Sequence, residues 1–151
     1  VFSEEYLGYS FEPSYVRGYS FYSFDPEECV AGGEDLQACA PLDRLIGTRV
    51  AVGGLELRVP LLGTERFGLL HVPFLPTELS AFVDGGVAWT ADDPPVWEWA
   101  TDTADRVPVV STGISARMNL FGAAVIEVFY ARPFQRPDKG GVVGVGLVPG
   151  W

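Results

Sequence analysis

The sequence predicts an all-β protein, an antiparallel transmembrane β-barrel of which this chain carries five strands. Three observations favour this fold. Apolar residues alternate with small or polar ones in five segments, and no segment shows helical periodicity. The segments approach the roughly 9–11 residues that a tilted membrane strand needs. Short connections alternate with long acidic ones, as they do in membrane barrels.

The five predicted strands share one pattern, in which one face is apolar and the other mixes Gly, Ser, Glu, Asp, Arg and Asn. They span residues 48–61, 78–90, 109–120, 124–132 and 141–151. In the second strand, Asp84 shares a face with Ser80 and Gly86, so alternation directs it into the lumen. Val83 then points to lipid. Five strands are too few to close a barrel, so we expect an open curved sheet.

A water-soluble β-sandwich would give the same alternation, and the pattern alone leaves this alternative open. Charged side chains in mid-strand suit a wet lumen better than the dry core of a sandwich. Together with the strand lengths and the connections, these charges favour the barrel. The chain starts at Val1 in the middle of a pattern, so we expect it to be a fragment or a processed piece.

The composition argues against several classes of protein. Hydrophobic residues make up 48% of the 151 residues, which disfavours disorder. The net charge of −10 disfavours a nucleic-acid partner, because phosphate binding needs clustered Lys and Arg. No apolar run approaches the ~18 residues of a membrane-spanning helix, and no signal peptide is visible.

Residues 25–43 combine acidic side chains with Cys29 and Cys39, the only two cysteines. With one histidine in the chain, they cannot form a zinc site of the usual four Cys and His ligands. In the cytosol both would be free thiols, whereas an oxidising compartment favours a disulfide, which we expect. The acids here and in residues 92–105 predict solvated loops, with divalent-cation binding as the alternative.

Four short motifs occur in an order that resembles one family. They are Val16-Arg17-Gly18-Tyr19, Gly53-Gly54-Leu55-Glu56, Phe82-Val83-Asp84-Gly85-Gly86 and the tail from Tyr130 to Trp151. They resemble the sixth extracellular loop, two barrel strands and the last hairpin of the BamA/TamA-like bacterial surface antigen superfamily, the outer-membrane protein assembly barrels. The resemblance covers nearly the whole chain, and the order of four motifs makes it specific.

The resemblance implies two regions and a contact between them. Residues 1–47 would form a long extracellular loop, and residues 48–151 would form the last five barrel strands. The loop would fold back into the barrel. There Arg17 would pair with Asp84, and Glu56 would be a further partner.

The remaining motif residues have implied roles as well. Gly18 would allow a tight backbone at the loop tip. Phe82 and Gly86 belong to the strand motif around the carboxylate. Trp151 would be the terminal aromatic residue of the closing strand. The paired cysteines inside the loop depart from the best-known members of the family.

The resemblance implies a protein of the bacterial outer membrane, in contact with its lipid, that assembles or translocates unfolded or exported proteins. Two alternatives stay open. One is a barrel that anchors or exports an attached soluble domain, and the other is a soluble disulfide-bonded β-sandwich that serves as a binding module. The residues that precede this chain would distinguish the assembly barrel from the anchoring or exporting one. We expect no cofactor, no metal and no nucleic acid.

Enzymatic interpretations fail on residue chemistry. An aspartic-protease carboxylate at Asp84 needs a hydroxyl residue next, and Gly85 supplies none. His71 has no serine in a Gly-x-Ser-x-Gly elbow to activate, so we expect it to be structural or solvated. Glu56 with Asp84 resembles an acid and base pair, but Arg17 would account for both charges. We therefore expect no enzyme.

Overall fold

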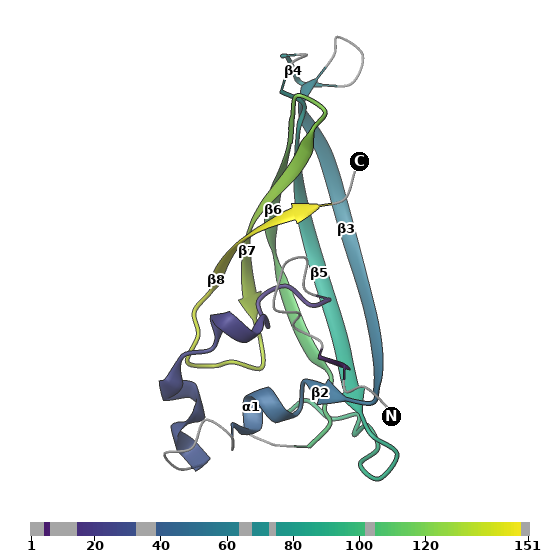
Figure 1. The fold of residues 1–151 in the computed structure, drawn as a ribbon, viewed down its shortest axis with the longest axis vertical. Helices are drawn as coiled ribbons and strands as arrows, with labels where there is room; N and C mark the ends of the chain where they lie inside the picture. The colour runs from purple at the N-terminus through teal and green to yellow at the C-terminus, as the bar shows by residue number, and fades with distance from the viewer. Residues whose placement is uncertain are drawn as a thin grey trace.

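The computed structural model describes residues 5–6, 15–32, 39–63, 68–72, 75–101 and 105–148 and consists mainly of one curved sheet (Figure 1). The strand order is β4-β3-β5-β6-β7-β8. The strands are β3 (Arg49–Gly63), β4 (Leu70–His71), β5 (Thr77–Trp89), β6 (Val109–Leu120), β7 (Ala124–Pro133) and β8 (Val142–Val148). All pairs are antiparallel except β3 with the short β4. The sheet is a half-barrel, so the predicted fold class is confirmed.

The segment before β3 contains short elements that the sequence did not reveal. Strand β1 (Glu5–Tyr6) pairs with β2 (Ile46–Gly47). The prediction of no helix was wrong here, because the segment also holds two 3-10 helices and one helical turn. These are η1 (Phe21–Ser23), η2 (Pro26–Gly32) and α1 (Ala40–Asp43). Each is too short to show a 3.6-residue period. The division of the chain at residues 47 and 48 stays a prediction.

The sheet has two different ends. Its loop end carries the described parts of residues 15–47, 90–108 and 134–141, and its hairpin end carries the connection from β6 to β7 and the segment from β3 to β5 (Figure 1). At the hairpin end, Phe121 and Gly122 both have positive φ, 53° and 77°. That backbone matches the twist of a tight hairpin. The segment between β3 and β5 contains the short strand β4, whose His71 is exposed.

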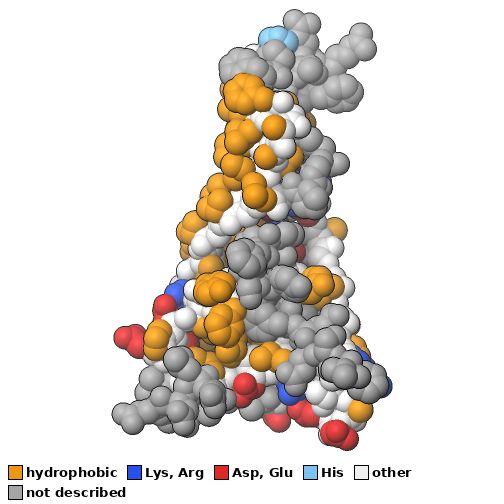
Figure 2. Space-filling model, viewed as in Figure 1, with side chains coloured by type: hydrophobic (Ala, Val, Ile, Leu, Met, Phe, Trp, Pro, Cys, Tyr) orange, Lys and Arg blue, Asp and Glu red, His pale blue; other side chains and the backbone are white. Residues whose placement is uncertain are grey.

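The two faces of the half-barrel differ as the alternation predicts. On the inner face, which the Arg17 side chain reaches, Asp84 is only 7% exposed. On the outer face, Val83 is 48% exposed and Leu57 and Ile114 are 71% and 64% exposed. Figure 2 shows hydrophobic side chains along the wall, with acidic ones gathered at the loop end. So large an exposed apolar surface is typical of a wall that faces lipid. None of the described helices is long and apolar enough to cross a membrane.

Two aromatic rings pack over glycines of the neighbouring strand on the inner face. Phe82 of β5 pairs in register with Gly113 of β6, and Phe129 of β7 pairs with Gly144 of β8. A Cβ atom on Gly113 would lie 2.7 Å from the Phe82 ring, so only glycine leaves the space for it. The two rings meet edge to face, with centroids 6.5 Å apart. Together they form an apolar floor inside the half-barrel.

A charge placed on the outer wall tests the lipid-facing assignment. Leu57 lies near the middle of β3, so Leu57→Arg should lower the free energy of unfolding of the membrane-embedded protein by about 2–4 kcal/mol. Thr48→Arg, at an exposed position just outside β3, should change it by less than about 1 kcal/mol. Urea unfolding in lipid vesicles measures both. Equal effects of the two substitutions would contradict a lipid-facing wall.

Candidate functional site

The tip of the loop is built so that Arg17 enters the half-barrel. Gly18 has a φ of +91°, which residues with a Cβ atom rarely adopt, and an added Cβ would lie 3.2 Å from the Cβ of Ala131. Val16 and Tyr19, on either side, are fully buried. They pack in one cluster with three residues of the wall and its entry segment: Leu45, Ala88 and Val109. The apolar neighbours therefore hold the tip while the arginine points inward.

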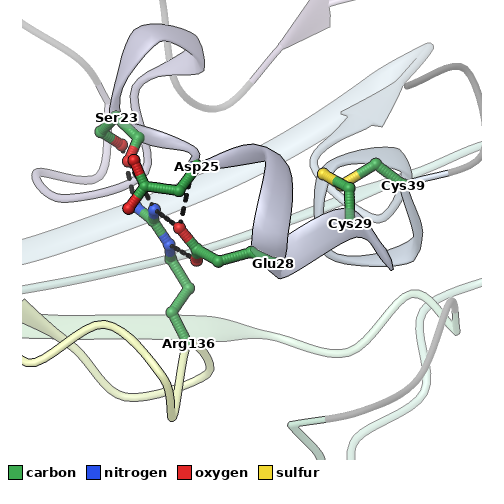
Figure 3. Close-up of a disulfide and its surroundings, with 6 residues drawn as sticks. All are labelled: Ser23, Asp25, Glu28, Cys29, Cys39 and Arg136. Atoms are coloured by element: carbon green, nitrogen blue, oxygen red, sulfur yellow. Dashed lines mark hydrogen bonds and ion pairs between the residues drawn. A yellow bond between two sulfur atoms is a disulfide. The ribbon is translucent and has the colours of Figure 1, made fainter. Parts of the chain in front are cut away.

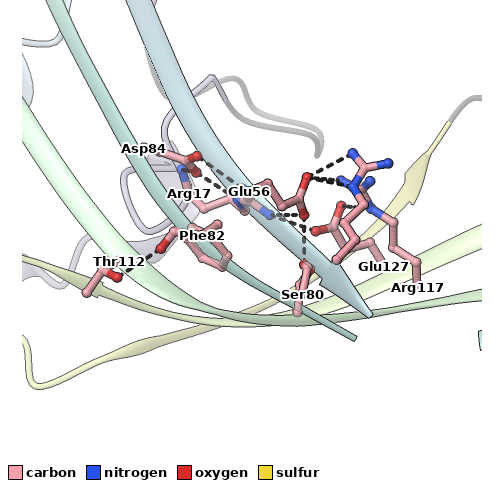
Figure 4. Close-up of polar contacts among 10 residues, drawn as sticks. Arg17, Glu56, Ser80, Phe82, Asp84, Thr112, Arg117 and Glu127 are labelled. Carbon is pink, nitrogen blue, oxygen red and sulfur yellow. Dashed lines mark hydrogen bonds and ion pairs between the residues drawn. The ribbon is translucent and has the colours of Figure 1, made fainter. Parts of the chain in front are cut away.

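The Arg17 guanidinium binds Asp84 through two parallel hydrogen bonds. Nε donates to Oδ2 at 2.7 Å and Nη2 donates to Oδ1 at 3.0 Å (Figure 4). The backbone N–H of Arg17 also donates to Oδ2, at 3.3 Å. The guanidinium carbon lies 3.4 Å from the centroid of the Phe82 ring. The fork-shaped contact and the stacked cation–π contact both suit an arginine, since lysine has a single charged nitrogen.

Arg17 also contacts two carboxylates on other strands. Its Nη1 donates to Oε1 of Glu127 on β7 at 2.9 Å and lies 3.5 Å from Oε1 of Glu56 on β3. Arg58 and Arg117 approach the same carboxylates from the wall, at 2.8 Å to Glu56 and 3.3 Å to Glu127. Three arginines thus face three carboxylates. We call these six residues the charge cluster: Arg17, Glu56, Arg58, Asp84, Arg117 and Glu127.

Hydroxyl groups complete the polar lining around the charge cluster. Ser80 donates to Oε1 of Glu56 at 2.7 Å and lies 2.6 Å from the hydroxyl of Ser115 on β6. Gly86, also named by the strand motif, is buried on the same face and pairs with Val52. The charges are therefore hydrogen-bonded to one another and to hydroxyl groups on the inner face.

A second arginine, whose role the sequence did not predict, binds the loop from the turn between β7 and β8. Arg136 lies in the turn from β7 to β8, and its side chain is fully buried. Nε and Nη2 donate to the two carboxylate oxygens of Glu28, at 2.7 and 2.6 Å (Figure 3). Nη1 donates to the Gly18 carbonyl at 2.6 Å and to the Ser23 hydroxyl, and Nη2 also reaches the Ser23 carbonyl. All five guanidinium N–H groups are thereby used.

The Phe24 ring covers this guanidinium, whose carbon lies 3.9 Å from the ring centroid. Burial alone would raise the pKa of Glu28, but hydrogen bonds from Arg136 outweigh it and hold that pKa below its ordinary value. We call Arg136 and its three partners the loop clamp: Gly18, Ser23 and Glu28.

Cys29 and Cys39 form a disulfide next to the loop clamp (Figure 3). It joins η2, which carries Glu28, to the residue before α1. After α1, the fully buried Arg44 donates to the Thr101 carbonyl at 3.0 Å and to the carbonyl of Gln135. The disulfide therefore connects two segments that are both bound to the β7–β8 turn.

Two further expectations concern the closing strand and metal binding. Trp151, the predicted terminal aromatic of the closing strand, lies outside the described residues. Among the described residues, no group of three or more His, Cys, Asp or Glu side chains could hold a metal ion.

The arrangement of loop, strands and charge cluster agrees with a family match. A family model described as the Omp85 superfamily domain matches residues 5–145. The chain belongs to the Omp85 superfamily. Proteins of this superfamily are bacterial outer-membrane proteins that handle protein substrates, and the resemblance to BamA/TamA-like surface antigens is confirmed at this level. No match was found among curated proteins or among solved structures.

We predict that Arg17 acts as a lock in this Omp85 chain: its contact with Asp84 keeps the loop tip docked. A double-mutant cycle tests this prediction. Arg17→Ala and Asp84→Ala should each weaken loop docking by about 3 kcal/mol or less, because the lumen is wet. New protease cleavage within residues 15–32 of an otherwise folded barrel measures the loss. The double variant should be little worse than either single one.

Arg58→Ala is the matched control, because Arg58 belongs to the same cluster but pairs only with Glu56 among the described residues. It should leave the cleavage pattern unchanged. If the effects of Arg17→Ala and Asp84→Ala add, the two side chains do not act as one unit and the lock is refuted.

Acidification should release the loop clamp. Because the pKa of Glu28 is lower in the folded protein, its contribution to stability is complete above the unfolded pKa of about 4.3 and disappears as the pH falls through the folded value. Protease cleavage of residues 15–32 should therefore rise below about pH 4. Glu28→Gln should reduce this dependence, whereas substitution of its exposed neighbour, Glu27→Gln, should preserve it in full. A pH profile that is the same in both variants would speak against the clamp.

Proposed function

We propose that this chain is the carboxy-terminal part of a BamA/TamA-type barrel that assembles or translocates proteins at the bacterial outer membrane. The observation that carries the proposal is the loop tip bound inside the half-barrel. Arg17 reaches carboxylates on β3, β5 and β7, so one side chain ties the loop to three strands. A barrel that only spans the membrane has no need of such a contact.

The proposed role requires no catalysis. Each carboxylate of the charge cluster faces at least one arginine at 3.5 Å or less, so none is a free acid or base. The cluster instead suits a structural task, which is to fix a loop inside a water-filled lumen. The expected partners are outer-membrane lipid and unfolded or exported proteins, with the outer membrane as the location.

An assay of substrate folding tests the proposal. The protein that contains this chain is reconstituted into lipid vesicles, and the folding of an added, urea-unfolded outer-membrane barrel is followed by its heat-modifiable gel mobility. The protein should speed this folding over empty vesicles. Arg17→Ala should reduce the acceleration, and Arg58→Ala should not.

Depletion in the bacterium separates assembly from anchoring. If the protein assembles others, its loss should lower the amounts of many outer-membrane proteins. If only a soluble domain of the same polypeptide disappears from the surface, the barrel is an anchor or exporter and the assembly role is wrong. Recovery of the protein outside the outer-membrane fraction would contradict both roles.

A further inference from the structure

Two arginines on the outer wall differ from the others. Most described cations bind carboxylates or backbone carbonyls, as Arg17, Arg106 and Arg136 do. Within the described residues, Arg49 and Arg132 form no ion pair and no side-chain hydrogen bond, and both are exposed. In a chain of net charge −10, cations without an acidic partner are unexpected. They call for an anion that the described residues do not supply.

Aromatic side chains frame both arginines. Arg132 lies on the outer face of β7 between Tyr130 and Phe134. Both are two residues away and therefore point to the same face, and they are 46% and 39% exposed. The Trp99 ring lies 6.1 Å from that of Phe134. Arg49 pairs directly with Trp89 across the strands. Tyrosine and tryptophan at the end of an apolar wall mark the level of lipid headgroups.

An apolar hollow lies next to Tyr130 on the side away from Arg132. Its volume is about 330 Å³. Ala116 contributes little bulk between its larger neighbours, and Tyr130 forms one wall. The outward-facing residues that line it are Leu79, Ile114, Ala116, Val128, Tyr130 and Val143. A hollow of this shape and chemistry fits a hydrocarbon chain rather than a polar ligand.

We propose that Arg132, with Tyr130 and the hollow beneath it, binds a phosphate-bearing lipid of the outer leaflet. The guanidinium donates to the headgroup phosphate, and an acyl chain occupies the hollow. Arginine can bind phosphate oxygens through two parallel hydrogen bonds. Its aliphatic stem lies along the apolar wall while the charge reaches the headgroup level. Arg49 beside Trp89 supplies a second headgroup contact at the same end of the wall.

The inference rests on the outer-membrane location proposed above. Its chemistry is separate from that of the charge cluster, because Arg132 faces outward whereas Arg17 lies on the inner face. A lipid accounts for both halves of the site, whereas a soluble anion would leave the hollow empty. A protein partner would need acidic residues for the arginine and an apolar side chain for the hollow, and this alternative is one outcome of the test.

Native mass spectrometry of the detergent-purified protein that contains this chain tests the site. The probes are dioleoyl phosphatidic acid, dioleoylglycerol with the same chains but no phosphate, and inorganic phosphate. Arg132→Gln should weaken retention of phosphatidic acid about five-fold, the effect of about 1 kcal/mol per basic residue near an anionic surface. Retention of dioleoylglycerol should not change. Arg132→Lys should keep most of the affinity, because it keeps the charge.

Two further variants separate the halves of the site. Ala116→Phe fills the hollow and should weaken both lipids alike. Lys139→Gln removes a cation that pairs with Asp25 at the loop end and is the matched control, with no expected change.

Three outcomes would overturn the proposal: retention of phosphatidic acid that Arg132→Gln does not alter, an equal loss in Arg132→Lys and Arg132→Gln, or full competition by inorganic phosphate. The first outcome leaves a protein partner as the occupant of the wall, and the last makes the site one for soluble anions. If the protein is found in the outer membrane but Arg132→Gln does not alter its lipid retention, only this inference is refuted. If the protein is absent from the outer membrane, the proposed location is refuted.

Discussion

The charge cluster is the interaction on which the rest of the structure depends. Its six charges balance only when Arg17 is present, because the strands alone contribute three carboxylates and two arginines. Uncompensated carboxylates on one curved face repel one another and bind water strongly. The wall therefore supplies the site for the loop, and the loop supplies the charge that the wall lacks. Neither part has a balanced set of partners by itself.

The loop clamp makes the attachment reciprocal. Arg17 extends from the loop to the strands, whereas Arg136 extends from the β7–β8 turn back to the loop. Arg136 binds the carbonyl of Gly18, the residue that follows Arg17. On either side of this tip, Val16 and Tyr19 bury their side chains against the wall. A segment fixed by two directional contacts and one apolar cluster has little freedom to rotate or slide. That is the arrangement a loop needs if it is to remain at one depth inside a lumen.

Alternation along the strands made most of the fold predictable, because period-two patterns encode which side chain faces which way. Asp84 is inward and Val83 outward for that reason. The short helices before β3 were missed because one or two turns are too few to display a period. Glu127 was missed although it had a signal, as the one acid on the inward face of β7. Arg136 had none, since its partners lie more than a hundred residues away and only the folded chain brings them together.

The separation in sequence between the loop and its partners constrains the order in which the chain can fold. Arg17 and Glu127 are 110 residues apart, and Arg136 and Gly18 are 118 apart. Closing such long intervals costs entropy before any contact compensates for it. The hairpins of neighbouring strands form over far shorter intervals. Complete docking of the loop tip is thus a late event, because two of its partners, Glu127 and Arg136, come from β7 and the turn after it.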